Sequence, residues 1–313
     1  MKCKLSAIAL SLTLAFACQF AAAASQTVTV SQSGTGNTAA ADQSGFSSDT
    51  FFTATITQIG NSNHVGGPGG TTAGIVQTMG IGGATATVTQ TGTGNNAGIF
   101  QHDVGYFPPN VEITQTGNTN SAVVDQGSSA GTDVLINQNG TGNAANVQQN
   151  AGDTEVRVTQ TGTNNSATVV NQFTGTTIGP TIEQNGDSNT VSATESSLLG
   201  GTHEIMQTGV RNNAITNQTD ATASAILLQQ IGADNQANIN QRGDFQSATI
   251  SQNGNNNLAS IDQVVIGGLL LGNSALITQA GSNNNGAIRQ VGDGFAAAIS
   301  QIGSGNTMSI YQH

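Results

Sequence analysis

The sequence is poor in the residues on which most globular domains depend. Of 313 residues, 7% are charged and 4% are aromatic, and there is no Trp. Ordinary domains carry roughly 25% charged residues. The two cysteines, Cys3 and Cys18, both lie in the first 24 residues, so the rest of the chain has no thiol for a disulfide or a thiolate metal site. These absences argue against a globular enzyme and against a disulfide-stabilised scaffold.

Basic residues are also scarce. The chain has 17 Asp and Glu against 6 Lys and Arg, and its net charge is -11. So acidic a chain is a poor partner for nucleic acid. The carboxylates are scattered singly, mostly in expected bends and loops, whereas acid/base chemistry needs them to converge in one pocket. The sequence therefore predicts no enzymatic activity, no small-molecule substrate and no cofactor. The four histidines share no spacing, which argues against a metal site; they are His64, His102, His203 and His313.

The N-terminus has the pattern of a secretory signal peptide. Lys2 and Lys4 form a basic start, residues 5–20 are apolar, and residues 21–24 are small. The apolar run is shorter than the roughly 20 residues that a membrane span needs. We therefore expect residues 1–24 to be removed, with a cut near Ala24, and residues 25–313 to be secreted.

What the chain has in abundance is a repeat. The stretch TVTQTGTGNNAGIFQ at residues 87–101 contains Gln90, then Gly92 two places later and Asn95 five places later. The same spacing occurs twelve times, with neighbouring anchor glutamines 22 to 32 residues apart. The anchor pairs are Gln32 and Asn37, Gln58 and Asn63, Gln90 and Asn95, Gln115 and Asn120, Gln138 and Asn143, Gln160 and Asn165, Gln184 and Asn189, Gln207 and Asn212, Gln230 and Asn235, Gln252 and Asn257, Gln279 and Asn284, and Gln301 and Asn306.

The flanking residues alternate with a period of two, as in β-strands. An aliphatic residue precedes each anchor by two places; Ala usually follows it by seven, Val or Ile often by nine, and Gln by eleven in nine copies. In the quoted stretch, Val88 and Gln90 share one face of a first arm, and Thr87 and Thr89 face outward. The Gly-rich segment between the arms suits a bend. Each repeat is thus predicted to be a strand, a bend and a second strand.

One such repeat cannot satisfy its strand edges alone, and stacking in parallel solves this. The predicted fold is all-β: a cross-β solenoid of about twelve stacked repeats over residues 25–313. Buried Gln and Asn would then bond to the same residue in the neighbouring layer, as in amide ladders. Glu195 stands where the second arm usually has Gln, and we expect its layer to be the weakest.

The spacing Q-x-G-x-x-N-x-A, followed by Gln four residues later, resembles the curlin repeat, and the resemblance covers nearly all of residues 27–312. It implies a secreted bacterial subunit that polymerises into curli, the extracellular amyloid fibres of biofilm matrix. It also implies cell-surface localisation, an adhesive and colonising role, and two partners besides the chain itself: a nucleator subunit and an outer-membrane secretion pore. Residues 301–312 contain no basic residue, which favours the major subunit. Unlike usual curlins, the chain has no Gly-rich leader between the signal peptide and the first repeat.

Several other features leave alternatives open. Thr-x-Thr strings favour an ice-binding solenoid, although the outward threonine column is interrupted, and a non-polymerising secreted adhesin is the other alternative. The tripeptide Arg-Gly-Asp at residues 242–244 matches a cell-adhesion motif, but we interpret it as part of a turn between two repeats, where Gly and Asp are expected. The apolar loop at residues 264–271 could dock a neighbouring fibre or a secretion factor, or it could fold back to form a small separate hydrophobic core. The insertion at residues 64–72 is expected to delay the second arm of its repeat until Gln77.

Overall fold

The computed structural model is all-β in the residues that it describes, which are 3–8, 12–18, 25–44, 51–66, 74–80, 82–104, 108–127, 131–150, 154–172, 179–196, 199–265 and 271–313. The predicted cleavage site and residues 266–270 of the apolar loop lie outside this part. The chain divides into two compact units, Met1–Thr161 and Gly162–His313. No helix long and apolar enough to span a membrane occurs among the described residues.

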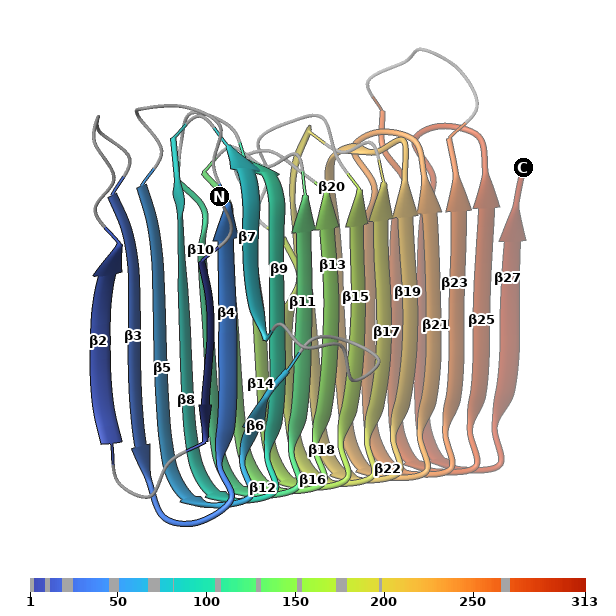
Figure 1. The fold of residues 1–313 in the computed structure, drawn as a ribbon. Coiled ribbons are helices and arrows are strands. Elements are labelled where there is room, and N and C mark those ends of the chain that lie inside the picture. Colours follow the sequence, from blue (N-terminus) through green and yellow to red (C-terminus); the bar gives the residue numbers. More distant parts are fainter. Residues whose placement is uncertain are drawn as a thin grey trace. The chain divides into compact units, whose positions relative to one another are not determined.

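The first unit contains two parallel sheets formed by alternate strands (Figure 1). The first-arm sheet carries the anchor glutamines, and its strands are β3 (Ser25–Ser33), β5 (Phe51–Asn61), β8 (Ala84–Thr93), β10 (Asn110–Asn118) and β12 (Asp133–Thr141). The second-arm sheet contains β4 (Thr38–Ser44), β6 (His64–Val65), β7 (Ile75–Gly80), β9 (Asn96–Val104), β11 (Ser121–Gly127) and β13 (Ala144–Asn150). Two antiparallel strands from the predicted signal peptide, β1 (Cys3–Ile8) and β2 (Leu12–Cys18), pair with β4 and β3.

The second unit repeats this arrangement. Its first-arm sheet contains β16 (Thr181–Asp187), β18 (Leu199–Val210), β20 (Thr222–Ala233), β22 (Ser247–Asn255), β24 (Ser274–Ser282) and β26 (Ala296–Ser304). Its second-arm sheet contains β15 (Ser166–Gln172), β17 (Thr190–Ser196), β19 (Asn213–Thr219), β21 (Gln236–Arg242), β23 (Leu258–Val264), β25 (Asn285–Val291) and β27 (Thr307–Gln312). Strand β14 (Glu155–Thr163) spans the boundary between the units.

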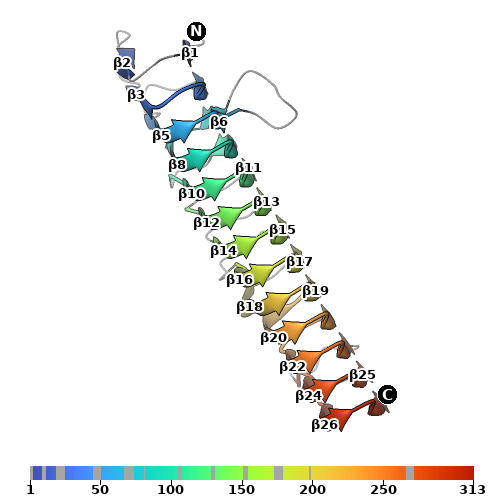
Figure 2. The same ribbon diagram turned by 90° about the horizontal axis from the view of Figure 1, so that it is seen from below.

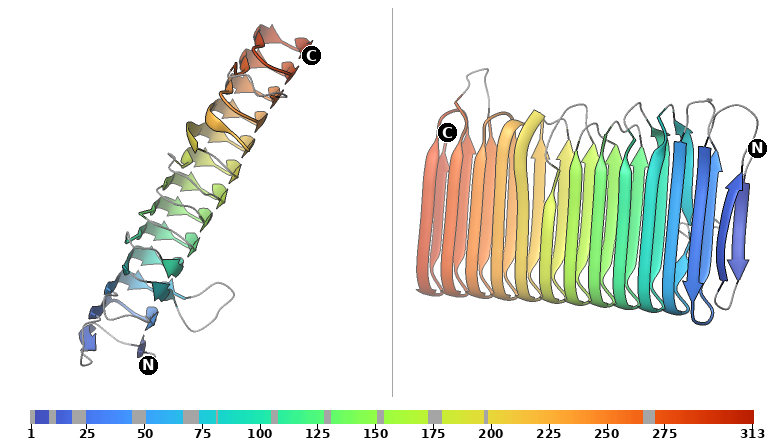
Figure 3. Two further views of the ribbon diagram at one scale, coloured as in Figure 1. Left: turned by 90° about the horizontal axis from the view of Figure 1, so that it is seen from above. Right: turned by 90° about the vertical axis from the view of Figure 1, so that its left-hand side faces the viewer.

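A rung is one strand-bend-strand repeat, and each unit is a stack of rungs. Figure 2 shows the two arms of a rung as separate layers, and the right-hand view in Figure 3 shows tight bends along one edge of the sheets. Among the described residues the first unit has five complete rungs and the second has six, and the boundary divides the rung of Gln160. The predicted β-solenoid of about twelve repeats is therefore confirmed.

The register explains the repeat spacing. Gln90 lies beside Gln58 and Gln115 in the neighbouring strands, and Val88 lies beside Ile56 in the same way. Because side chains on a strand alternate between its faces, every second residue enters the space between the two sheets. Val88, Ile99 and Gln90 are accordingly buried, whereas Thr87 and Thr89 are half-exposed. The core is a set of columns, each containing the equivalent residue of every rung.

The bends depend on a backbone conformation that the repeat pattern conceals. The residue four places after each anchor is left-handed, with φ of 53° at Thr119 and at Arg211, yet glycine occupies this position in only four copies. A left-handed non-glycine residue costs about 1–3 kcal/mol and persists only where its surroundings impose that conformation. Here a rung-to-rung bond does so: Thr119 N–H donates to Thr93 O at 2.9 Å, and Arg211 N–H donates to Asp187 O at 2.9 Å.

The irregular repeats keep their place in the stack. The second arm after Asn63 is split into β6 and β7, and Gln77 in β7 is buried beside Gln43 and Gln101. This is the delayed arm that the insertion predicts. The described prolines avoid the strands: Pro108 and Pro109 precede β10, and Pro180 directly precedes β16. Proline lacks the N–H that a central strand needs.

Candidate functional site: amide ladders and the ends of the stack

Glutamine side chains form a continuous chain of hydrogen bonds inside each first-arm sheet. Gln58 Nε2 donates to Gln90 Oε1 at 2.8 Å, and Gln90 Nε2 donates to Gln115 Oε1 at 2.8 Å. The second hydrogen of Gln90 Nε2 goes to the main-chain oxygen of His64, at 3.1 Å. The amide is therefore satisfied in both its donors and its acceptor, which a buried polar group requires. The anchors of the first unit are Gln32, Gln58, Gln90, Gln115, Gln138 and Gln160; those of the second are Gln184, Gln207, Gln230, Gln252, Gln279 and Gln301, and all are buried.

Asparagines form a second ladder of opposite direction at the start of the second arm. Asn95 donates from both its main-chain N and Nδ2 to Asn63 Oδ1, at 3.1 Å each. Its Nδ2 also donates to Gly117 O in the next rung, at 2.9 Å. In the amide-to-amide bonds, glutamines thus donate to the next rung toward the C-terminus and asparagines donate to the preceding rung. The members are Asn37, Asn63, Asn95, Asn120 and Asn143 in the first unit and Asn165, Asn189, Asn212, Asn235, Asn257, Asn284 and Asn306 in the second; all but Asn306 are buried.

A third ladder joins the glutamines that end the second arms. The predicted site residues do not include it, although Gln eleven places after the anchor was a visible signal. Gln101 Nε2 donates to Gln126 Oε1 at 3.0 Å, and Gln241 Nε2 donates to Gln263 Oε1 at 3.0 Å. In the second unit the column opens with two other residues, Asn171 and Glu195. Its remaining members are Gln43, Gln77 and Gln149 in the first unit and Gln218, Gln290 and Gln312 in the second.

Glycine two places after the anchor is required by the stacking itself. A Cβ added to Gly92 would lie 2.0 Å from Gly117 O in the next rung, and one added to Gly117 would lie 2.1 Å from Gly140 O. The same carbonyl oxygens accept hydrogen bonds from the asparagine side chains, so the backbone cannot move away from an added Cβ without breaking the asparagine ladder. In the last rung this constraint is absent, because the nearest atom to a Cβ on Gly303 is Asn306 Nδ2 at 3.8 Å.

In the last described rung Gln301 is still buried and Gln312 is half-buried, but no further rung lies beyond their amides among the described residues. Gln301 Oε1 and Gln312 Oε1 both accept from the preceding rung at 2.8 Å, and each Nε2 donates to one main-chain oxygen. Their forward hydrogens face the position that a further rung would occupy. Ile302 is 82% exposed and Tyr311 is 55% exposed. This end is therefore an unpaired sheet edge with half-made ladders.

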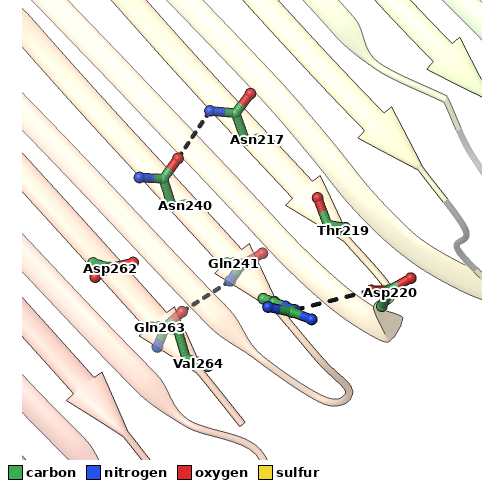
Figure 4. A pocket seen from close by; sticks show the side chains of 9 residues that line it. Asn217, Thr219, Asp220, Asn240, Gln241, Asp262, Gln263 and Val264 are labelled. Carbon is green, nitrogen blue, oxygen red and sulfur yellow. Dashed lines mark hydrogen bonds and ion pairs between the residues drawn. The ribbon is translucent and has the colours of Figure 1, made fainter.

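The outer surface offers little for chemistry. Figure 4 shows a hollow of about 380 Å³ on the second-arm sheet of the second unit, with the Gln241–Gln263 pair among its lining residues. Its carboxylates face arginines: Asp220 lies 4.0 Å from Arg242 Nε, and Asp262 lies 3.2 Å from Arg289 Nε. No group of three His, Cys, Asp or Glu suited to a metal gathers in the part of the chain described.

The Arg-Gly-Asp tripeptide is built into a turn. Gly243 is left-handed, with φ of 99°, and Asp244 Oδ1 accepts from Thr222 N–H of the preceding rung at 2.7 Å. Elsewhere on the bends, Arg211 forms two bonds to Asp234, at 2.7 and 2.8 Å. Hydrogen bonding from Arg211 lowers the pKa of Asp234, and the same bond raises the pKa of Arg211. Arg211 is exposed and the Asp234 side chain is 35% exposed, so solvent screening keeps their contribution to stability small.

The outward column just before the anchors bears on the ice-binding alternative. In the first unit, Thr57, Thr89 and Thr114 lie in register and are followed by Asn137. In the second unit the same column holds Glu183, Met206 and Gln229. Threonine is therefore aligned over a few rungs of the first unit only.

Comparison with known proteins agrees with this geometry. A family model for the curlin associated repeat matches residues 232–264. This span runs from the end of β20 through β23 and includes Asn235, Gln252 and Asn257 of the ladders. The resemblance to curlins is thereby confirmed over these residues. No curated protein matches the chain.

Proposed function

We propose that this chain is a secreted structural subunit of the curlin type, which polymerises end to end into extracellular, cell-surface fibres of bacterial biofilm matrix. The curlin repeat and the β-solenoid are both features of structural proteins rather than of enzymes. The observation that carries the proposal is the last rung, where exposed strands and half-made ladders suit the docking of another rung. Adhesion and surface colonisation would follow from the fibre.

The first rung of the first unit and the last rung of the second unit are chemically complementary. At the C-terminal end, Gln301 and Gln312 offer amide hydrogens and Asn306 offers its Oδ1. At the N-terminal end, Gln32 and Asn37 direct their bonds to the next rung, which leaves the Gln32 Oε1 and the Asn37 N–H on the outer side. A second copy stacked with its first rung on the last rung of the first would continue both ladders. Stacking two like ends would instead place donors against donors and acceptors against acceptors.

Processing of the N-terminus belongs to the same proposal. Strands β1 and β2 pair with the outer edges of β4 and β3, and both lie within residues 1–24. Removal of these residues during secretion would leave β3 and β4 as free parallel edges, which readily pair with another chain. A nucleator subunit and an outer-membrane pore are the further partners that we propose.

Gly303→Ala tests stacking directly. In the isolated chain the new methyl group meets nothing closer than Asn306 Nδ2 at 3.8 Å, and the cost is limited to the strain of alanine at the Gly303 φ of 104°. Equivalent glycines inside the stack would instead place the methyl group 1.9–2.1 Å from a carbonyl of the next rung. Gly305→Asn is the matched control, because it changes the same rung at a left-handed position where Asn164, Asn256 and Asn283 are already present.

Elongation is followed by Thioflavin T fluorescence with and without preformed seeds. We expect the native chain and Gly305→Asn to elongate, and Gly303→Ala alone to fail. If fibres grow at the C-terminal end, small amounts of Gly303→Ala will also stop growth of native seeds, since its first rung docks and its last rung then accepts nothing. A misfolded variant would be inert. Normal elongation by Gly303→Ala, or a native chain that stays monomeric and dye-silent for days, would refute the proposal and favour a non-polymerising adhesin.

A further inference from the structure

The second-arm ladder of the second unit is interrupted by a polar cluster whose parts come from different columns. Asn171, Glu195 and Gln218 lie in register in β15, β17 and β19, where the other rungs have glutamine. Glu195 is 1% exposed. Its carboxylate cannot donate to the next ladder position as an amide does. Its Oε2, and both polar atoms of Asn171, have no hydrogen-bond partner among the described residues.

The facing arm supplies a compensating residue. His203, in β18, occupies a column that is otherwise aliphatic and lies in register with Ile226. Its Nδ1 is 2.7 Å from Glu195 Oε1, and its Nε2 is 2.8 Å from Thr216 Oγ1. Thr216 also replaces an aliphatic residue, since it lies beside Ala193 and Ile239 in β17 and β21. Glu195, His203 and Thr216, which all depart from the repeat, therefore form one hydrogen-bonded cluster.

Because this cluster is buried, its stability depends on the number of protons that it holds. The side chains of His203 and Glu195 are 0% and 1% exposed. With one proton between them, the pair is neutral overall, either as an ion pair or as two neutral groups. A second proton leaves a buried imidazolium without a counter-charge, and loss of the only proton leaves a buried carboxylate alone. An uncompensated buried charge is strongly destabilising.

No other charge is placed to compensate. Among the described residues of β15 to β20, the remaining ionisable groups are Glu183, Asp187 and Glu204, and all three are exposed. A second proton on Glu195 Oε2 would allow a new bond to Asn171, but one neutral hydrogen bond contributes less than a buried unpaired charge costs. Hydrogen bonding within the cluster therefore does not remove the dependence on proton number.

We propose that Glu195, His203 and Thr216 form a pH-sensitive cluster in the second unit. The cluster stabilises its rungs when the Glu195–His203 pair holds one proton, and a second proton or the loss of the first destabilises them. The proposal concerns the stability of the rungs β16–β19 and does not depend on polymerisation. It also accounts for the position of a carboxylate inside a stack of neutral amides.

The expected pH dependence follows from proton counting. If the folded cluster admits only one proton, strong acid favours unfolding, because both side chains are protonated in an unfolded chain. Above neutral pH the unfolded chain carries neither proton, so alkali also favours unfolding. On the acid side and on the alkaline side of the stability profile, this pair changes the unfolding equilibrium constant by at most about tenfold per pH unit, because one proton is exchanged.

The test compares urea unfolding of the purified native protein with two variants between pH 3 and pH 9, at concentrations where it stays monomeric. The double variant Glu195→Gln with His203→Val restores the repeat, since Val28, Val111 and Val134 occupy the His203 column in the first unit. Glu204→Gln removes an exposed carboxylate from the same strand as His203. We expect the double variant to lose the contribution of this pair to the fall in stability in acid and in alkali, up to about tenfold per pH unit, and Glu204→Gln to retain it.

NMR of the native protein, with isotope in its histidine rings, gives a second readout that needs no variant. We expect the His203 ring to keep one protonation state until its rungs open. An identical pH profile in the double variant would overturn the proposal. So would a His203 ring that gains and loses its proton freely while the rungs stay closed.

Discussion

The free energy of an amide ladder can be measured by removing one member from its middle. Gln115 is fully buried, donates from Nε2 to Gln138 Oε1 at 2.8 Å and to Asn96 O at 2.9 Å, and accepts from Gln90 at 2.8 Å. Gln115→Ala leaves one hydrogen of Gln90 and the Oε1 of Gln138 without partners. Each unsatisfied buried group costs about 1–3 kcal/mol, so we expect a loss of about 2–6 kcal/mol in the free energy of unfolding.

The matched control is Gln148→Ala, which removes the same side chain from an exposed position on β13. A surface change of this kind alters stability by about 0.5 kcal/mol or less. Urea unfolding of the unassembled protein gives the difference between the variants. Hydrogen exchange locates it, because in a stack each rung contacts only its neighbours and lost protection should centre on β8, β10 and β12. Equal stability of Gln115→Ala and Gln148→Ala would show that the buried amides are not the source of cohesion.

Two further perturbations follow from the bends. Gly117→Ala should prevent normal stacking of its rung, because its Cβ would lie 2.1 Å from Gly140 O. Gly94→Asn should fold normally, because Gly94 is at a left-handed position with φ of 68°. Circular dichroism and urea unfolding midpoints compare the two variants, and equal midpoints would contradict the argument. The pKa of Asp234, which the Arg211 hydrogen bond lowers, should return toward its ordinary value in Arg211→Gln. The depressed pKa favours the folded state above the ordinary carboxyl range, an effect lost as pH falls through the folded pKa, but exposure keeps it slight. Carboxyl NMR titration measures the shift, and an unchanged Asp234 would refute it.

The repeat was sufficient to predict the fold because its two periods carry independent information. Alternation by two identifies the inner face of each strand, and the recurrence of Gln, Gly and Asn identifies which residues become neighbours between rungs. Even the displaced Gln77 was predictable, since its column has to be filled before the next rung. The anchor positions in the ladders could therefore be named from sequence.

Other features depend on contacts that no spacing reveals. The left-handed residue four places after the anchor is variously Gly, Ser, Thr, Asn, Asp or Arg, because a main-chain bond from the neighbouring rung imposes the conformation. In the sequence, His203 is one of four histidines that share no spacing, and Glu195 is an exception at a position that usually holds Gln. Their partnership joins opposite arms of successive rungs, and only the three-dimensional stack brings those positions together.

The buried amides also explain how the stack keeps its register. A shift of one residue would expose the core, but a shift of two would keep the same faces inside. Aliphatic columns tolerate such a shift, because Val, Ile and Ala already exchange places in them. Amide columns do not, since each shifted Gln would face an apolar side chain and lose its bonds, at about 1–3 kcal/mol per unsatisfied group. An amide core thus contributes specificity that an apolar core of equal stability would lack, and the same selectivity would apply to a rung arriving from another copy of the chain.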